Sequence, residues 1–249
     1  MIKKMMLTVI FVMIMLAWQL NTGQTQVVTD GLVSYWTFDK ADIDGETVKD
    51  VFGNNDGTIV GEPQIVKGKV GDALEFNGAS DYVEVEDDES LQLWTTHTLE
   101  AWLYQKESRS SRIIDKITAG TADGLHLDTH PGTKLRTCSG NCISTDIDYS
   151  LETWVHAIVT FNDGEVKLYI NGSVEGEGEV PSPLSGNSLP LRIAADSNGQ
   201  NLFLGIIDEV RIYNRVLNKT EINQNMNAEG LAVLSSYNKL AITWGKIKK

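Results

Sequence analysis

Two histidines and an aspartate alternate in the segment HLDTH, near the middle of this 249-residue chain. In a β-strand, His126, Asp128 and His130 would share one face, because side chains alternate with a period of two. Three such side chains can bind a transition metal, or they can form a hydrogen-bonding floor for sugar hydroxyls. A solvated strand end is the third alternative, because Pro131 and Gly132 mark a turn directly after the segment.

Basic residues are concentrated around this segment, although the chain as a whole is acidic. The formal net charge is −13, and removal of residues 1–23 with their two lysines would leave 19 basic and 34 acidic residues, a charge of −15. A chain so acidic is a poor partner for nucleic acid or anionic membranes. It would also disfavour a strongly anionic polysaccharide, unless a local basic patch offsets the field. The five basic residues form either such a patch or a set of solvated loop charges: Arg109, Arg112, Lys116, Lys134 and Arg136.

The chain contains two cysteines, Cys138 and Cys142, and only Ser-Gly-Asn lies between them. In an oxidising compartment this pair predicts a disulfide across the tip of a hairpin. A zinc site would need two more ligands at matching spacing. Because the closed loop is so short, we expect the disulfide to fix local shape more than global stability.

The segment GIIDEVRIYNRVLNKTEI, close to the C-terminus, predicts a long strand followed by a short helix. Period-two alternation gives the strand an apolar face, made up of Ile206, Val210 and Ile212. Asp208 falls on this same face, where an ionised carboxylate needs a cation or several hydrogen-bond donors. Asn218, with Glu221 three residues later, predicts a capping-box helix start.

The remainder of the chain between residues 30 and 217 predicts strands and tight turns, with no helical period of useful length. Asn162-Asp163-Gly164 and Asn171-Gly172 bracket the run EVKLYI, and Asn-Gly between alternating residues is the strongest short hairpin signal. A chain of this length can form one undivided β-sandwich.

The two ends differ from this body. Lys3 and Lys4 precede an apolar run from Met5 to Trp18, which is the layout of a secretory signal peptide over residues 1–23. An uncleaved membrane anchor is the alternative, although the run is short for a full span. Residues 227–249 predict a linker with a weakly ordered extra strand, or a short sorting tail. We therefore expect an exported protein, either secreted or at the cell surface.

Five further segments precede the final strand and helix in a fixed order: GLVSYWTFD, VFGNNDGTI, GKVGDALEFNGASDYVEV, HTLEAWLY and ETWVHAIVTFNDGEVKLYINGSV. Together they resemble the laminin-G-like domains of the concanavalin A-like lectin/glucanase superfamily. The resemblance covers residues 31–226 and implies an all-β fold, a two-sheet antiparallel jelly-roll β-sandwich with one short C-terminal helix. This fold hosts lectins, carbohydrate-binding modules, adhesion domains, glycosidases and lyases, so it implies no single function.

The resemblance also implies a structural calcium site. Related jelly rolls hold the ion between an N-terminal strand, a glycine-containing turn and an aspartate of the last long strand. Carried over by motif, the positions are Asp39, the Asn77-Gly78 turn and Asp208. Calcium prefers such hard oxygen ligands. The alternative is a hydrogen-bonded pair of acids, Asp39 and Asp208, without a metal.

For function, the sequence favours a non-catalytic glycan-binding or adhesion module over a polysaccharide lyase or glycoside hydrolase. The nearest match to the Glu-x-Asp-x-x-Glu motif of jelly-roll glucanases is EVEDDE, in which Glu86 stands where the motif has Asp. No lyase motif is recognisable. Trp94 and Tyr104 are the aromatic residues least committed to the core, and aromatic side chains stack on sugar rings. We expect the ligand to be a glycan or cell-surface polysaccharide, bound by some of these residues: Trp94, Tyr104, Arg112, His126, Asp128, His130 and Arg136.

Overall fold

The computed structural model describes residues 25–118 and 121–231, and the chain divides into two compact units. One unit is Val28–Met226, and the other comprises Met1–Val27 and Asn227–Lys249. The expected signal peptide at residues 1–23 lies outside the described residues, as does most of the expected C-terminal tail. None of the helices in the described ranges is long and apolar enough to span a membrane.

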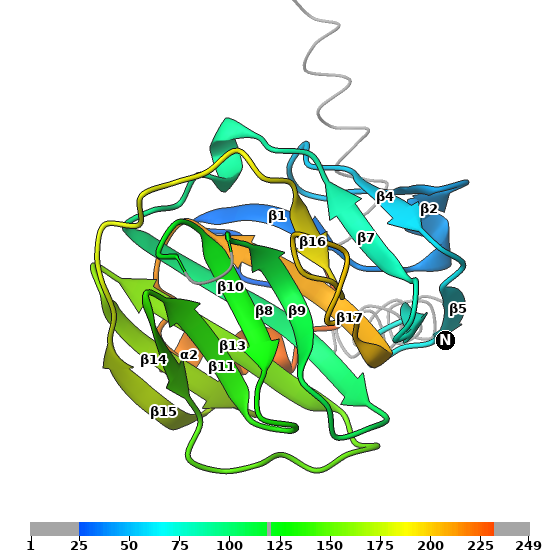
Figure 1. The fold of residues 1–249 in the computed structure, drawn as a ribbon. Helices are drawn as coiled ribbons and strands as arrows, with labels where there is room; N and C mark the ends of the chain where they lie inside the picture. The colour runs from blue at the N-terminus through cyan, green and yellow to red at the C-terminus, as the bar shows by residue number, and fades with distance from the viewer. Residues whose placement is uncertain (1–24, 119–120, 232–249) are drawn as a thin grey trace, which may run out of the picture. The chain divides into compact units, whose positions relative to one another are not determined.

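Two antiparallel sheets form the Val28–Met226 unit (Figure 1). Sheet A has eight strands among the described residues, in the order β15-β14-β13-β8-β17-β6-β5, with β1 also paired to β17. Its strands are β1 (Leu32–Trp36), β5 (Gln64–Lys67), β6 (Asp72–Asn77), β8 (Thr96–Gln105), β13 (Val155–Asn162), β14 (Glu165–Ile170), β15 (Ser173–Glu179) and β17 (Leu204–Tyr213).

Sheet B has nine strands among the described residues, in the order β12-β11-β10-β9-β16-β7-β4-β3-β2. They are β2 (Ile43–Asp44), β3 (Thr47–Val48), β4 (Gly57–Val60), β7 (Tyr82–Val85), β9 (Ser111–Lys116), β10 (Leu125–Thr129), β11 (Leu135–Ser139), β12 (Asn141–Ser144) and β16 (Leu191–Ile193). Two 3-10 turns, η1 (Lys40–Asp42) and η2 (Glu89–Leu91), and one helix, α2 (Lys219–Met226), complete the described elements. The predicted antiparallel jelly roll with a short C-terminal helix is confirmed.

The core lies between the sheets and follows the alternation of the strands. In β8, Leu99, Ala101 and Leu103 are fully buried in it, and the facing residues of β13 include Ala157 and Val159. Burial of each large aliphatic side chain contributes about 1.5–3 kcal/mol. The intervening residues of these strands, Glu100 and His156 among them, must therefore point to the outer side of sheet A.

A β-bulge in β17 changes the face of the strand on which Asp208 lies, compared with the prediction. Glu209 has a positive φ of 55°, and the pairing with β8 shifts register between Asp208 and Arg211. An extra residue of this kind reverses the alternation beyond it. Ile207, Val210 and Ile212 are the core residues, whereas Ile206 is only partly buried and is not part of the core. The prediction that Ile206 and Asp208 belong to the apolar face was therefore wrong.

A network of buried charges occupies the outer side of sheet A. Arg211, which is fully buried, bonds to Glu100 at 2.8 Å and forms an ion pair with Glu209. Tyr35 donates to Glu209, and His156 Nε2 lies 2.7 Å from Glu100. Burial would raise the pKa of Glu100, but Arg211 and His156 outweigh it and lower the pKa. Burial would also lower the pKa of Arg211, yet the surrounding acids and tyrosines hold it above its usual value.

Helix α2 covers this network, and its start has the predicted capping box. The Asn218 side chain accepts from the backbone of Thr220 and Glu221, and Glu221 accepts from the Asn218 backbone at 2.8 Å. From the buried side of the helix, the Asn225 amide donates to Glu100 at 2.7 Å and to Tyr213 at 2.8 Å. The outer side of sheet A is thus covered here by α2 through buried polar contacts.

Candidate functional site

The outward face of sheet B brings together several of the residues selected from the sequence. The predicted strand around HLDTH is β10, which lies between β9 and β11. Leu125 and Leu127 of β10 belong to the core, so His126 and Asp128 share the opposite face. His126 is paired with Asp115 of β9, and Asp128 with Arg112 of β9 and Arg136 of β11.

Asp128 is fully buried between two arginines, and we call Asp128, Arg112 and Arg136 the Asp128 clamp. Arg136 donates to Asp128 from Nε at 3.0 Å and from Nη2 at 2.6 Å, and Arg112 donates from Nη1. The arginine side chains remain 15% and 17% exposed. Burial alone would raise the pKa of Asp128, but His126 and Arg136 lower it well below its usual range. The clamp is therefore a buried carboxylate covered by accessible guanidinium groups.

His126 links the clamp to the neighbouring strand. Its Nδ1 accepts a hydrogen bond from the Cys138 backbone N–H at 3.0 Å. An accepting Nδ1 carries no proton, which leaves the ring N–H on Nε2. Nε2 is 3.3 Å from Asp128 and 4.0 Å from Asp115. The ring is 2% exposed, so it does not face solvent.

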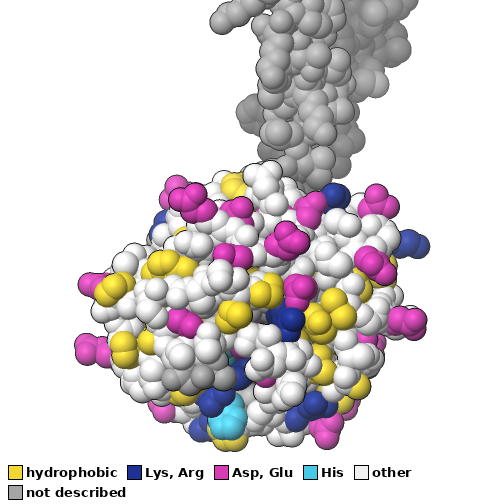
Figure 2. Space-filling model, turned by 45° about the horizontal axis from the view of Figure 1, so that its top comes forward, with side chains coloured by type: hydrophobic (Ala, Val, Ile, Leu, Met, Phe, Trp, Pro, Cys, Tyr) yellow, Lys and Arg dark blue, Asp and Glu magenta, His cyan; other side chains and the backbone are white. Residues whose placement is uncertain are grey.

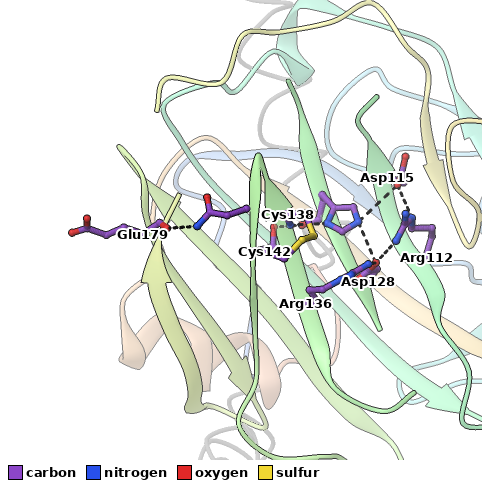
Figure 3. Close-up of a disulfide and its surroundings, with 10 residues drawn as sticks. Arg112, Asp115, Asp128, Arg136, Cys138, Cys142 and Glu179 are labelled. Atoms are coloured by element: carbon purple, nitrogen blue, oxygen red, sulfur yellow. Dashed lines mark hydrogen bonds and ion pairs between the residues drawn. A yellow bond between two sulfur atoms is a disulfide. The ribbon is translucent and has the colours of Figure 1, made fainter. Parts of the chain in front are cut away.

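Asp115, which the sequence did not single out, completes the buried part of the site (Figure 3). Its Oδ2 lies 3.0 Å from Arg112 Nε, and its Oδ1 accepts from the Ser197 backbone at 3.2 Å. Burial raises the pKa of Asp115, and the nearby His126 and Arg112 only partly oppose this. Two carboxylates of one cluster are thus shifted in opposite directions, as often occurs at functional sites.

A second group of polar side chains lies at the C-terminal end of β10. His130 follows the strand and is exposed, and its Nδ1 lies 2.8 Å from the Ser110 hydroxyl. Its backbone N–H donates to Lys134 at 2.8 Å. Lys134 in turn donates from Nζ to the Asp146 carbonyl at 2.8 Å. Ser110, His130 and Lys134 therefore lie near the Asp128 clamp, at the C-terminal end of β10.

Cys138 and Cys142 form the predicted disulfide, which joins paired positions of β11 and β12. The bond lies beside the clamp, because the Cys138 backbone holds His126. On the other side of the hairpin, the Asn141 amide donates to the Glu179 carbonyl at 3.0 Å (Figure 3). The disulfide hairpin thus connects the outward face of sheet B with the edge of sheet A.

Replacing both cysteines with serine is expected to lower the free energy of unfolding by about 2 kcal/mol or less, because so short a loop restricts the unfolded chain only a little. Guanidinium denaturation of the double variant and of the reduced wild-type protein measures this effect. The two should give the same midpoint. A variant that no longer unfolds cooperatively would show that the disulfide holds more of the fold than its own hairpin.

The structure does not bring the two selected aromatic residues to this cluster. Trp94 is partly buried against the core, with the Lys116 ammonium 6.0 Å from its ring. Tyr104 belongs to β8 of sheet A, where its ring meets that of Trp154 edge to face at 5.7 Å. Lys116 is not part of an exposed basic patch, because its side chain is fully buried and its ammonium donates to Asp87 at 2.6 Å.

The four residues of the expected calcium site lie in two places. Asp39 and Asp208 flank one turn: Asp39 accepts from the Asp72 backbone at 2.6 Å, and Asp208 Oδ2 accepts from Lys69 and Val70. Asp208 Oδ1 is buried and has no hydrogen-bond partner. Asn77 ends β6 at the opposite end from Asp72, about 16 Å away at 3.3 Å per residue, and Gly78 follows it.

In the part of the chain that the structure describes, no group of three or more His, Cys, Asp or Glu side chains is arranged to hold a metal ion.

A groove with a volume of about 270 Å³ lies on the outer side of sheet A. Its lining, which we call the sheet A groove, consists of Thr96, Thr160, Asn162, Glu165, Lys167, Tyr169, Val216, Leu217 and Asn218. The sheet A groove is the alternative candidate for a ligand site, beside the outward face of sheet B.

Comparisons with known proteins agree with the observed fold. The family model of the concanavalin A-like lectin/glucanases superfamily matches residues 77–223. The chain is 26% identical over 179 residues to adhesion G-protein coupled receptor V1 of Danio rerio, which covers 63% of this chain. It spans only 3% of the length of that receptor.

Solved structures show the same fold at low sequence identity. Domain 4 of AbnA, an extracellular arabinanase of Geobacillus stearothermophilus solved with arabinotriose, has a TM-score of 0.62 and 21% identity. The match covers 78% of this chain and 98% of that domain. Trypanosoma rangeli sialidase has a TM-score of 0.60 and 21% identity, over 80% of this chain and 33% of the sialidase chain.

Proposed function

Because this chain belongs to the concanavalin A-like lectin/glucanase superfamily, we propose that it is a glycan-binding module that catalyses no reaction. The sugar binds on the outward face of sheet B, over β9, β10 and β11. The observation that carries this proposal is the Asp128 clamp, in which a buried carboxylate fixes two guanidinium groups that remain accessible.

The chemistry of the clamp suits sugar recognition. Sugar hydroxyls are recognised by a few polar groups held in fixed positions. A guanidinium presents its donors in a rigid fork, so little freedom is lost when it binds. Arg112 and Arg136 are already held by Asp128, which further reduces the ordering cost of binding.

The burial of the acids supports binding without catalysis. A glycosidase needs two carboxylates on one accessible surface, roughly 5–10 Å apart. Asp115 and Asp128 are 1% and 0% exposed, and the arginines lie over Asp128. A substrate over the clamp would therefore meet the guanidinium donors before it met Asp115 or Asp128.

We place this module outside the cytoplasm, secreted or on the cell surface, with a glycan or cell-surface polysaccharide as its partner. The basic and apolar N-terminus supports export. The arabinanase domain, which shares the fold, comes from an extracellular enzyme and was solved with a sugar. We further propose a structural calcium ion at Asp39 and Asp208, supported by the unpartnered Asp208 oxygen.

A glycan array with the wild-type protein, followed by calorimetry on the best ligand, tests the function. Arg136→Ala is expected to weaken binding about 10- to 100-fold, because a hydrogen bond to a charged group contributes about 1.5–3 kcal/mol. Lys167→Ala, which alters the sheet A groove, is the matched control and should bind normally. An array without any bound glycan, or release of products from a polysaccharide, would contradict the proposal.

A further inference from the structure

The basic residues near β10 do not give the Asp128 clamp a surplus of positive charge. Lys116 is fully buried, and the Arg109 guanidinium donates to the Gly78 carbonyl at 3.1 Å, beside sheet A. The Lys134 ammonium donates to the Asp146 carbonyl at 2.8 Å and so lies next to an acidic residue. In Figure 2, acidic side chains are spread over the face shown, from its upper edge to its lower edge.

Asp196, which follows β16, adds a third acid to the two at the clamp. Its charge acts on both Arg112 and Asp115. Burial would raise the pKa of Asp196, but hydrogen bonds from its own loop lower it. The two clamp arginines thus face three aspartates, Asp115, Asp128 and Asp196, which leaves a formal charge of −1. Burial raises the pKa of Asp115, and a proton bound there would bring this charge to zero, not above it.

The loop at residues 196–201, which we call the Asp196 loop, borders the clamp on the side of β9. The Ser197 backbone N–H donates to Asp115 Oδ1 at 3.2 Å. The Arg112 backbone N–H donates to the Asn201 carbonyl at 2.8 Å. In sheet B, β10 and then β11 lie on the other side of β9. A ligand that lies across the clamp and extends past Arg112 would therefore meet the Asp196 loop.

The Asp196 loop holds two exposed amide side chains on an ordered backbone. Asp196 Oδ1 accepts from the backbone of Asn198 at 2.9 Å and of Gln200 at 2.8 Å, and Oδ2 accepts from the Asn201 amide at 2.7 Å. The side chains of Asn198 and Gln200 are exposed and have no hydrogen-bond partner within residues 25–118 and 121–231. A carboxamide both donates and accepts hydrogen bonds, as a sugar hydroxyl does.

We propose that the glycan is a neutral sugar, bound between the Asp128 clamp and the amides of Asn198 and Gln200. This inference rests on the proposed glycan-binding function and specifies its ligand class. Asp128 occupies two of the five N–H donors of Arg136, so the guanidinium retains donors for sugar hydroxyls. A carboxylate or sulfate would have to share the arginines with three aspartates, and like charges placed together disfavour binding.

The first test uses the full-length protein on an array of paired glycans: oligouronates with their carboxyl-reduced forms, and sulfated oligosaccharides with their desulfated forms. The neutral member of a pair should bind at least about tenfold more tightly. Its affinity should change little as salt rises, because a neutral ligand has no charge to screen. Tighter binding of the charged members would overturn this inference while the proposed function stands.

The second test removes the loop amides. Asn198→Ala and Gln200→Ala leave the backbone bonds to Asp196 in place, and each should weaken binding of the neutral glycan by about three- to tenfold, as loss of one hydrogen bond does. The matched control is Gln64→Ala, which removes an exposed glutamine side chain from β5 of sheet A and should bind normally.

The double variant of Asn198 and Gln200 separates this inference from the proposed function. If it binds as the wild type does while Arg136→Ala loses affinity, the clamp binds the glycan without the Asp196 loop, and this inference is wrong. If the wild-type protein binds no glycan, charged or neutral, both proposals are wrong.

Discussion

Replacing Arg211 with methionine is expected to lower the free energy of unfolding by about 3–5 kcal/mol, because it leaves buried acids without their cation. Arg211 is fully buried between Glu100 and Glu209 and also contacts the Tyr35 hydroxyl. The same network holds Asn225 of α2, so the helix should loosen as well.

Urea denaturation at neutral pH measures this change, and hydrogen exchange in α2 reports on the helix. A triple variant that adds Glu100→Gln and Glu209→Gln removes the stranded charges and should recover part of the loss. Full stability of Arg211→Met alone would show that these acids are satisfied by Tyr35, His156 and Asn225 without the arginine.

Asp208 is expected to make the stability of the protein depend on pH and on calcium. Burial, reinforced by the charge of Glu209, raises the pKa of Asp208 from 3.8 to about 8. The folded state therefore holds the proton more tightly than the unfolded state. The stability from this group is fully present below pH 4 and is lost as the pH rises through 8, unless a cation neutralises the carboxylate.

Thermal unfolding of the wild-type protein and of Asp208→Asn, between pH 5 and 9 with calcium or chelator, isolates this effect. In chelator, the melting temperature of the wild type should fall toward high pH relative to the variant. Millimolar calcium should restore it at pH 8 by binding only the folded state, and should change little at pH 5. Identical responses of the two proteins to pH and calcium would contradict the calcium proposal.

The fold was predictable because its signals are local and repeated. Alternating strands, the Asn171-Gly172 turn and the capping box of Asn218 and Glu221 each depend on a few neighbouring residues. The shared face of His126 and Asp128 followed from the same period of two. What failed in β17 was the assumption of an unbroken period, because no residue type marks the bulge at Glu209.

The missed parts of the site depend on distant contacts. Arg112 and Asp115 are three residues apart, so strict alternation would place them on opposite faces. The irregular pairing of β9 with β10 brings both to the outward face, and the consecutive buried pair Ile113-Ile114 was the available hint. Lys116 looked like a surface charge because its partners include Asn187 and Leu189, far along the chain.

An NMR titration of the arginine side-chain Nε–H groups with the best array ligand tests the central claim most directly. Arg112 and Arg136 should shift in parallel with the backbone amides of β9, β10 and β11, because the sugar contacts the Asp128 clamp. Amides around the sheet A groove, such as those of Lys167 and Tyr169, should not move. Shifts confined to that groove, with the clamp arginines unchanged, would contradict the assignment of the glycan site.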